Sequence, residues 1–417
     1  MLFRCRALVL AFLAAAPTQP ASERDAPGHV LAACAVFAPD GTSAAASIYA
    51  QRLLLEIAHP SGKELHLELP LRYPEHEQPN TRVRYTCRAY ADQKSELVAV
   101  GIGRDTLTSH YQLQVAVANL ESGAWIGDWE VGPISGIHSP ILAGFLNGTS
   151  SLAVTGVAAR PTPNGEGLQH GKFMTMTFGS TGRLLTPVPE TRSYSSDSDI
   201  FPTYADSVHN RLWVFHCVAV SARMERQPVC PITSTTLTGD ESPAVEFDPT
   251  SLGRKRADLW FDATSFVAPT ADSIMFAEYG GRGAILWRVN VGVQSADPLV
   301  MPSRHFPSIM LHPAMVSAGA SAAVQSPDGE VVAVPLPHGV LAFPYLTDDY
   351  VYKGTDVAVV RVEPLQLLAV VQHEHRSDPI AFAVDHRQGR VTVLVRRNDG
   401  WERTELRPPK VAKSPER

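Results

Sequence analysis

Apolar and polar positions follow one arrangement seven times along the chain: an apolar run, a tight polar turn and a second apolar run. Clear copies are Cys34–Ala46 (CAVFAPDGTSAAA), Leu142–Val154 (LAGFLNGTSSLAV) and Ala322–Val334 (AAVQSPDGEVVAV). The other copies are Cys87–Val100, Tyr204–Val214, Phe266–Phe276 and Ala381–Val393. Short apolar runs bounded by Gly, Asp, Asn and Ser are typical of β-strands joined by hairpin turns.

The seven copies are evenly spaced. The first core positions after the turns are Ala44, Leu97, Leu152, Leu212, Ile274, Val331 and Val391, so successive copies are 53 to 62 residues apart. A unit of this length holds four short antiparallel strands, and seven such units arranged in a circle form a β-propeller. The sequence therefore predicts an all-β, seven-bladed propeller of four-stranded antiparallel blades over residues 22–407.

Two details of the blades can also be predicted. In the second unit, strands are expected over 82–91, 95–102, 111–120 and 124–131, with Trp125 and Trp129 on one face of the last strand. The seventh unit offers only three strands, at 380–384, 390–396 and 401–407. Because an unpaired edge is an aggregation hazard, we expect Gly28–Leu31 to supply the missing strand.

Residues 1–21 read as a secretory signal peptide. Arg4 and Arg6 precede the apolar run Ala7–Ala16, and cleavage after Ala16 or Ala21 fits equally well. An uncleaved N-terminal anchor is the alternative, although the apolar run is short for a bilayer span. No later stretch could cross a bilayer, so we expect a periplasmic or secreted protein without a membrane span in the mature chain. The polar, proline-rich tail 408–417 is expected to be disordered.

Four cysteines remain beyond the signal peptide, and an even number in an exported chain predicts disulfides. Cys217 and Cys230 would face each other across one hairpin. Cys34 and Cys87 hold the same place in consecutive units, so they would lie on neighbouring inner strands. A zinc site is not supported, because no CxxC motif or cysteine–histidine spacing is present.

Composition and motifs exclude some functions. The formal net charge is −6, which argues against a nucleic-acid partner, since such proteins carry a basic face. No GxSxG elbow, Walker loop, dinucleotide-binding glycine motif or HExxH occurs, so no catalytic residue and no cofactor is predicted.

The sixth and seventh units resemble the YVTN-type repeats of seven-bladed propellers found in many exported bacterial proteins. Ser326–Val334 (SPDGEVVAV) looks like the first hairpin turn of such a repeat, and Asp356–Val395 looks like the following strands, linker and hairpin. The resemblance implies the propeller fold and a periplasmic or surface setting. It implies little about activity, because propellers serve as enzymes, receptors and scaffolds alike.

Candidate chemistry lies in the linkers between units, which a propeller gathers around its axis. Aligned on the repeat, the linkers place the following residues at one register, mostly just before proline: His138 or Ser139, Phe201, Asp262, His312 and Asp378. Such a set could bind a ligand or a metal, or supply a general base oriented by a carboxylate. Local capping of the linker backbone is the simpler interpretation of the same residues.

Two functions from different classes follow. The first is a non-catalytic binding module that holds a protein, peptide or glycan at the axial face. The second is a metal-assisted hydrolase or lactonase-like enzyme that uses the same histidines and aspartates. A purely structural scaffold is a third reading, because fold alone does not decide function.

Overall fold

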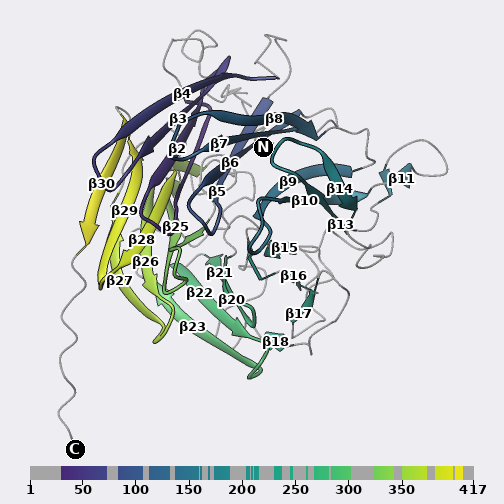
Figure 1. The fold of residues 1–417 in the computed structure, drawn as a ribbon. Helices are drawn as coiled ribbons and strands as arrows, with labels where there is room; N and C mark the ends of the chain where they lie inside the picture. The colour runs from purple at the N-terminus through teal and green to yellow at the C-terminus, as the bar shows by residue number, and fades with distance from the viewer. Residues whose placement is uncertain are drawn as a thin grey trace, which may run out of the picture.

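The chain forms a ring of antiparallel β-sheets (Figure 1). The computed structural model describes residues 30–72, 83–106, 112–131, 137–158, 160–161, 168–169, 173–187, 203–206, 208–209, 211–215, 230–236, 245–247, 260–261, 267–280, 283–301, 323–341, 350–372, 381–397 and 400–406. No helix within those ranges has the length and apolar character that a bilayer crossing needs.

The first three sheets follow in chain order. The first holds β1 (Ala32–Phe37), β2 (Ser43–Ile48), β3 (Arg52–Ala58) and β4 (Glu64–Pro70). The second holds β5 (Val83–Ala91), β6 (Leu97–Thr106), β7 (Gln112–Asn119) and β8 (Trp125–Val131). The third holds β9 (Ile137–Phe145), β10 (Leu152–Ala158), β13 (Phe173–Phe178) and β14 (Leu184–Pro187), and β11 (Arg160–Pro161) pairs with β12 (Leu168–Gln169) apart from it.

Four more sheets complete the ring. The fourth holds β15 (Thr203–Asp206), β16 (Arg211–Phe215), β17 (Cys230–Thr236) and β18 (Val245–Phe247). In the fifth, β19 (Trp260–Phe261) and β20 (Val267–Thr270) both pair with β21 (Ser273–Gly280), which is followed by β22 (Gly283–Asn290) and β23 (Ser295–Met301). The sixth holds β24 (Val324–Gln325), β25 (Val331–Leu341), β26 (Tyr350–Arg361) and β27 (Gln366–Val371). The seventh holds β28 (Phe382–Arg387), β29 (Arg390–Arg397) and β30 (Gly400–Leu406).

The first strands of the sheets close the circle. Each of β1, β5, β9, β15, β20, β24 and β28 contacts the first strand of the next sheet, and β28 contacts β1 in turn. In Figure 1 the last sheet, coloured yellow, accordingly lies beside the first, coloured purple. The predicted all-β, seven-bladed propeller is confirmed.

The period read from the sequence also matches the strands. The seven first core positions, Ala44, Leu97, Leu152, Leu212, Ile274, Val331 and Val391, lie in β2, β6, β10, β16, β21, β25 and β29, the second strand of each sheet. The repeat therefore marks the same structural position in every blade.

The core lies between sheets, and each sheet buries both faces. In β6, Val98 and Val100 pack in a cluster with the first sheet, whereas Leu97 and Ala99 pack in a cluster with the third. Successive side chains of a strand point to opposite faces, so a strand covered on both sides needs an unbroken apolar run. This arrangement explains why the second strands are the most continuously apolar segments of each repeat.

Two tryptophans lie in the core between blades. Trp213 of β16 and Trp287 of β22 are buried in one cluster between the fourth and fifth sheets. Their rings fill the space between blades and are not available as ligand platforms.

The prediction that Trp125 and Trp129 share a face is wrong. Trp125 packs against the first sheet, whereas Trp129 packs in the core shared with the third. Pairing of β7 with β8 shifts register between Val117 and Ala118, which places Ile126 in a bulge. One extra residue reverses the alternation of faces beyond it, and the sequence pattern alone did not reveal this bulge.

The seventh sheet has three strands in the described part of the chain, one fewer than predicted. Leu31, expected to help complete it, instead donates its N–H to Ile48 O and so extends the first sheet. Val30 packs beside Ala381 and Trp401 of the seventh blade. Gly28, where the expected segment begins, lies outside the described residues. The segment before β1 therefore helps to close the ring through the packing of the Val30 side chain.

A disulfide joins the first two blades. Cys34 in β1 and Cys87 in β5 are bonded, with their Cα atoms 5.3 Å apart, as their equivalent repeat positions predicted. The side chains of Cys217 and Cys230 lie outside the described part of the structure, so that second pairing stays a prediction.

Removing the Cys34–Cys87 bond should destabilise the propeller. The bond closes a loop with a sequence separation of 53 residues, which in the chain-entropy model is worth about 4 kcal/mol. Cys34→Ala/Cys87→Ala should therefore unfold at lower temperature and denaturant concentration than the oxidised wild type. Any further loss of stability when this variant is reduced would report the predicted Cys217–Cys230 bond. Equal stability of the variant and the oxidised wild type would contradict the assignment.

Candidate functional site

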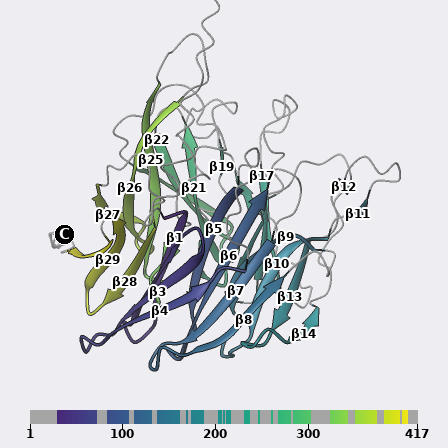
Figure 2. The same cartoon turned by 90° about the horizontal axis from the view of Figure 1, so that it is seen from above.

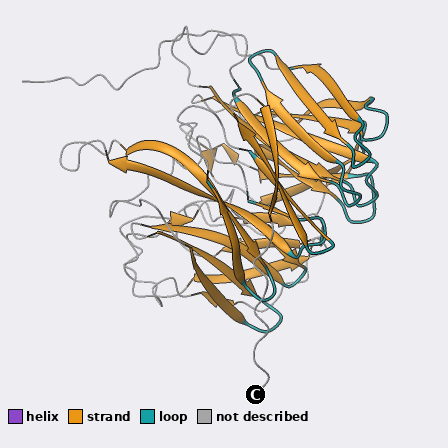
Figure 3. Cartoon of the chain, turned by 90° about the vertical axis from the view of Figure 1, so that its left-hand side faces the viewer, coloured by secondary structure: helices purple, strands orange, loops and turns teal. Residues whose placement is uncertain are grey.

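The two ends of the sheets differ in the chain that connects their strands. At one end of the ring, turns join the first strand of a sheet to the second and the third strand to the fourth, and we call this end the turn face. All other connections join strand ends at the opposite end, which we call the linker face. Described turns of the turn face are short, as at 38–42, 59–63, 92–96 and 120–124. In Figure 3 the described loops, coloured teal, gather at this end of the sheets.

Connections at the linker face vary in length: those over 49–51 and 281–282 are short, but many are much longer. The longer ones connect consecutive sheets over 71–82, 188–202, 248–259, 302–323 and 372–381, and join strands within a sheet over 159–172, 216–229 and 342–349. The paired ends of β25 and β26 project at this side of the ring (Figure 2). Tyr350–Gly354 belongs to β26.

The four predicted ligand residues map onto this end only in part. His138 is the second residue of β9 and pairs with Val157, so its backbone lies where the chain enters the third sheet. Asp262 follows β19 directly in sequence, but it lies outside the described residues, as do His312 and Asp378. Whether the four come together at the axis stays a prediction.

Neighbouring blades are joined by hydrogen bonds between their turns on the turn face. The Asp40 N–H donates to Ser95 Oγ at 2.9 Å, and the Gly148 N–H donates to Gln93 Oε1 at 3.2 Å. Further around the ring, Arg211 Nη2 donates to Asp272 Oδ1 at 3.2 Å. These contacts fix one blade against the next near the inner strands.

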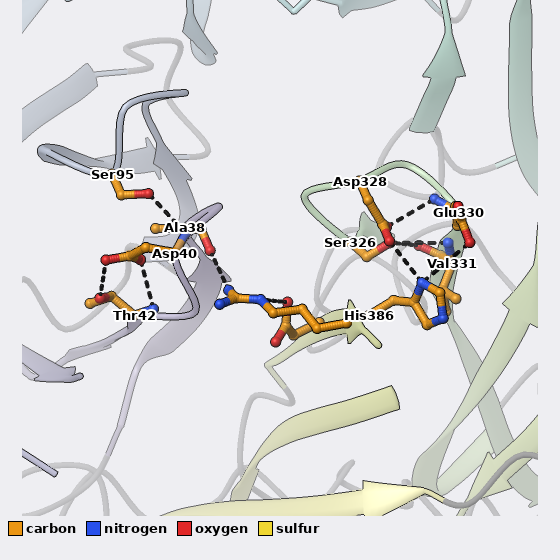
Figure 4. Close-up of polar contacts among 11 residues, drawn as sticks. Ala38, Asp40, Thr42, Ser95, Ser326, Asp328, Glu330, Val331 and His386 are labelled. Atoms are coloured by element: carbon orange, nitrogen blue, oxygen red, sulfur yellow. Dashed lines mark hydrogen bonds and ion pairs between the residues drawn. The ribbon is translucent and has the colours of Figure 1, made fainter. Parts of the chain in front are cut away.

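Closure of the ring has its own polar contact. Arg387, the last residue of β28, donates from Nη2 to the carbonyl oxygen of Ala38 in the first blade at 2.9 Å. Its Nε also donates to Asp385 Oδ1 at 3.1 Å, and Asp385 is buried. Figure 4 shows Ala38 of the first blade, whose carbonyl oxygen accepts this bond.

A polar cluster lies at the seam between the sixth and seventh blades (Figure 4). His386 Nδ1 is 2.7 Å from Asp328 Oδ2 and 3.4 Å from Glu330 Oε2. Asp328 and Glu330 belong to the turn before β25, and His386 belongs to β28. We call these three residues the seam cluster.

The turn that presents Asp328 is fixed by its own sequence. The Ser326 N–H donates to Val331 O at 2.8 Å, and the Gly329 N–H donates to Ser326 O at 2.9 Å. Gly329 has φ of 73°, a left-handed conformation that glycine adopts without strain. A side chain at Gly329 would also meet Pro269 O of the fifth blade. The serine and glycine thus hold Asp328 toward the seventh blade.

Asp328 is ionised more readily than an ordinary aspartate. Burial alone would raise the pKa of its carboxyl, but hydrogen bonds from Ser326, the Glu330 backbone and His386 outweigh burial and lower it. Each of these donors stabilises the charged form. The Asp328 carboxyl is therefore ionised at neutral pH.

A second histidine–aspartate pair lies in the turn of the fourth blade. His209 Nδ1 is 2.6 Å from Asp206 Oδ2, and the Asp206 side chain is only 3% exposed. The hydrogen bond to Asp206 raises the pKa of His209, against an opposing effect of burial. This pair has a single carboxylate, whereas the seam cluster has two.

The seam cluster was not predicted from the sequence. Asp328 precedes its core position Val331 by three residues, whereas His386 precedes Val391 by five, so the repeat alignment does not superimpose them. A signal was present, because charged and histidine side chains fill two consecutive turns, SPDGE and DHRQG. Knowing that neighbouring turns touch would have been needed to use it.

No protein-family model matches the chain, and no curated protein matches it. Solved structures similar to it include the uncharacterized protein lmo1340 from Listeria monocytogenes EGD-e, with 6% identity, a TM-score of 0.42 and coverage of 93% of this chain and 96% of that one. The WD40 domain of SCAP from fission yeast shows 10% identity and a TM-score of 0.39, with coverage of 92% and 85%.

A third similar structure comes from a study of two prolyl endopeptidases. It shows 9% identity and a TM-score of 0.39, and the match covers 89% of this chain but 55% of that protein. None of the three likenesses identifies a ligand or a reaction for this chain.

Removing the arginine that closes the ring should weaken the propeller. Arg387→Ala loses the bond to Ala38 O and leaves the buried Asp385 carboxylate without that partner, at a cost of about 1.5–3 kcal/mol. Arg390→Ala is the matched control, because Arg390 is 74% exposed and contacts only Glu405 at 3.5 Å among the ion pairs of the described residues. Denaturant unfolding should separate the two variants; equal midpoints would contradict a role for Arg387 in closure.

The Asp206–His209 pair predicts a pH-dependent stability. Because folding raises the pKa of His209, its contribution should be complete below the unfolded-state value near 6.5 and should fade as pH rises through the folded-state value. The stability difference between wild type and His209→Gln should therefore shrink from weakly acidic to alkaline pH. Urea unfolding across that range measures it, and a difference that does not change with pH would contradict the prediction.

Proposed function

We propose that this chain is an exported β-propeller that binds a protein, peptide or glycan through its linker face. The observation that carries the proposal is the asymmetry between the two ends of the ring. One end has short turns bonded to one another, and strand ends at the other are joined by segments such as 188–202 and 302–323. Binding residues are disproportionately found on long connections held by a rigid scaffold.

The proposed export rests on two features. The N-terminal segment has the charge and apolar pattern of a signal peptide. The Cys34–Cys87 bond suits an oxidising compartment such as the periplasm or the cell exterior. A relation to YVTN-type exported propellers, suggested by Ser326–Val334 and Asp356–Val395, belongs to the same proposal.

The residues we assign to ligand binding are His138, Asp262, His312 and Asp378. They lie at one register, or one residue from it, where the sequence leads into the inner strands, and the inner strands contact one another around the ring. Equivalent positions of a ring approach a common axis, so a single ligand could contact several of them.

The experiment uses protein recovered from the periplasm. If the signal peptide is cleaved on export, the intact mass of this protein should correspond to an N-terminus at Pro17 or Ser22. That protein is screened against a displayed peptide library and a glycan array, and the affinity of each selected ligand is measured. His312→Ala/Asp378→Ala should weaken binding at least about tenfold, as expected for the loss of polar contacts at a buried interface.

Glu121→Ala is the control, because Glu121 is exposed in a turn of the turn face. It should leave the affinity unchanged. Failure of both libraries to yield a ligand, or loss of binding in Glu121→Ala with none in the double variant, would overturn the proposal.

A further inference from the structure

Three potential metal ligands converge at the seam cluster, on the face opposite the proposed binding site. His386 Nδ1, an Asp328 oxygen and a Glu330 oxygen all lie within 4.8 Å of one another. They come from two blades, since the carboxylates precede β25 and the imidazole is in β28. Figure 4 shows the histidine ring directed between the two carboxylates.

The spacing is close to that of a tetrahedral ion. Zinc binds imidazole nitrogen and carboxylate oxygen at about 2.0–2.2 Å, which separates neighbouring ligand atoms by roughly 3.3 Å. The 3.4 Å from His386 Nδ1 to Glu330 Oε2 matches that value. The 2.7 Å to Asp328 Oδ2 is a hydrogen-bond distance, and it would lengthen by a few tenths of an ångström when an ion replaces the proton.

Asp328 is oriented by groups that would not ligate the ion. Its Oδ1 accepts from Ser326 Oγ at 2.5 Å and from the Glu330 N–H at 3.1 Å, while Oδ2 faces His386. The Val331 N–H in turn donates to Ser326 Oγ at 3.0 Å. In known metal sites, hydrogen bonds of this kind orient the side chains that ligate the ion. One oxygen of Asp328 is therefore already directed toward the seam.

Solvent can reach the cluster, so an ion has a path of entry. The exposed fractions are 14% for the His386 side chain, 36% for Asp328 and 67% for Glu330. An ion held by three protein atoms at such a site would complete its coordination with water.

The ligand types select the class of ion. One imidazole with two carboxylates suits zinc and its neighbours in the transition series, whereas calcium and magnesium prefer oxygen ligands alone. Two carboxylates and a neutral imidazole also balance the charge of a divalent ion. We propose that Asp328, Glu330 and His386 form a site for a divalent transition-metal ion such as Zn²⁺ that bridges the sixth and seventh blades.

The competing interpretation is a metal-free ion pair, in which a protonated His386 is shared by both carboxylates. The metal site and the ion pair make different predictions, because a metal ion must displace the proton from His386 Nδ1. Binding should therefore release protons and weaken as pH falls, as it does for metal sites with histidine ligands.

The test uses the tag-free mature chain after dialysis against EDTA, titrated with Zn²⁺ in a calorimeter near neutral pH. We expect one ion per chain, with proton release seen as a dependence of the heat on the buffer. Glu330→Gln should weaken binding about 10–100-fold, and His386→Ala should abolish it. Glu330→Gln alters an exposed group, so its fold can be verified by an unchanged unfolding midpoint in EDTA.

His66→Ala is the matched control, because His66 forms an exposed pair with one carboxylate, Glu56, at 3.6 Å. It should bind Zn²⁺ as the wild type does. Zinc should also raise the melting temperature of the wild type and of His66→Ala but not of His386→Ala, because an ion bound to the folded state stabilises it. Absence of binding, or binding unchanged in His386→Ala and Glu330→Gln, would overturn the assignment.

Discussion

Packing of one sheet against the next is the interaction on which this structure depends. Each core cluster draws its side chains from neighbouring sheets, as Val331 and Ala333 pack toward the seventh blade while Val332 and Val334 pack toward the fifth. A single four-stranded sheet could not bury two apolar faces by itself. The ring solves that problem, because every sheet has a neighbour on both sides.

This requirement separates the molecule into parts with different freedom to vary. Neighbouring blades are held together through their strands and the turn face, by apolar packing, hydrogen bonds and the Cys34–Cys87 disulfide. Segments that leave the linker face can differ in length from blade to blade without breaking those contacts, as 132–136 and 302–323 do. A scaffold of this kind can acquire new binding chemistry at one end while the other end keeps the blades in register.

The sequence predicts the fold well because the fold depends on a local pattern. Seven apolar runs with polar turns identify the second strand of every blade, and equal repeat positions correctly paired Cys34 with Cys87. Details that depend on one inserted residue or on neighbouring blades are not local. The bulge at Ile126 reversed the face of Trp125, and Leu31 joined the first sheet where a strand of the last was expected.

Prediction of functional residues from the sequence has the same limit. His138, Asp262, His312 and Asp378 were chosen from an alignment of repeats, which compares equivalent positions only. In the seam cluster, by contrast, Asp328 lies three residues before the core position of its blade, whereas His386 lies five residues before the core position of the next blade. Contacts between non-equivalent positions depend on the distance and angle between blades, which no single repeat encodes.

The junction between the last and first blades has a consequence for biosynthesis. Phe37 and Ala45 are buried against Ala383 and Leu394, so they are covered only after the seventh blade has been made. A nascent chain would carry this uncovered apolar surface until the seventh blade had been synthesised, and such surfaces attract chaperones or other chains.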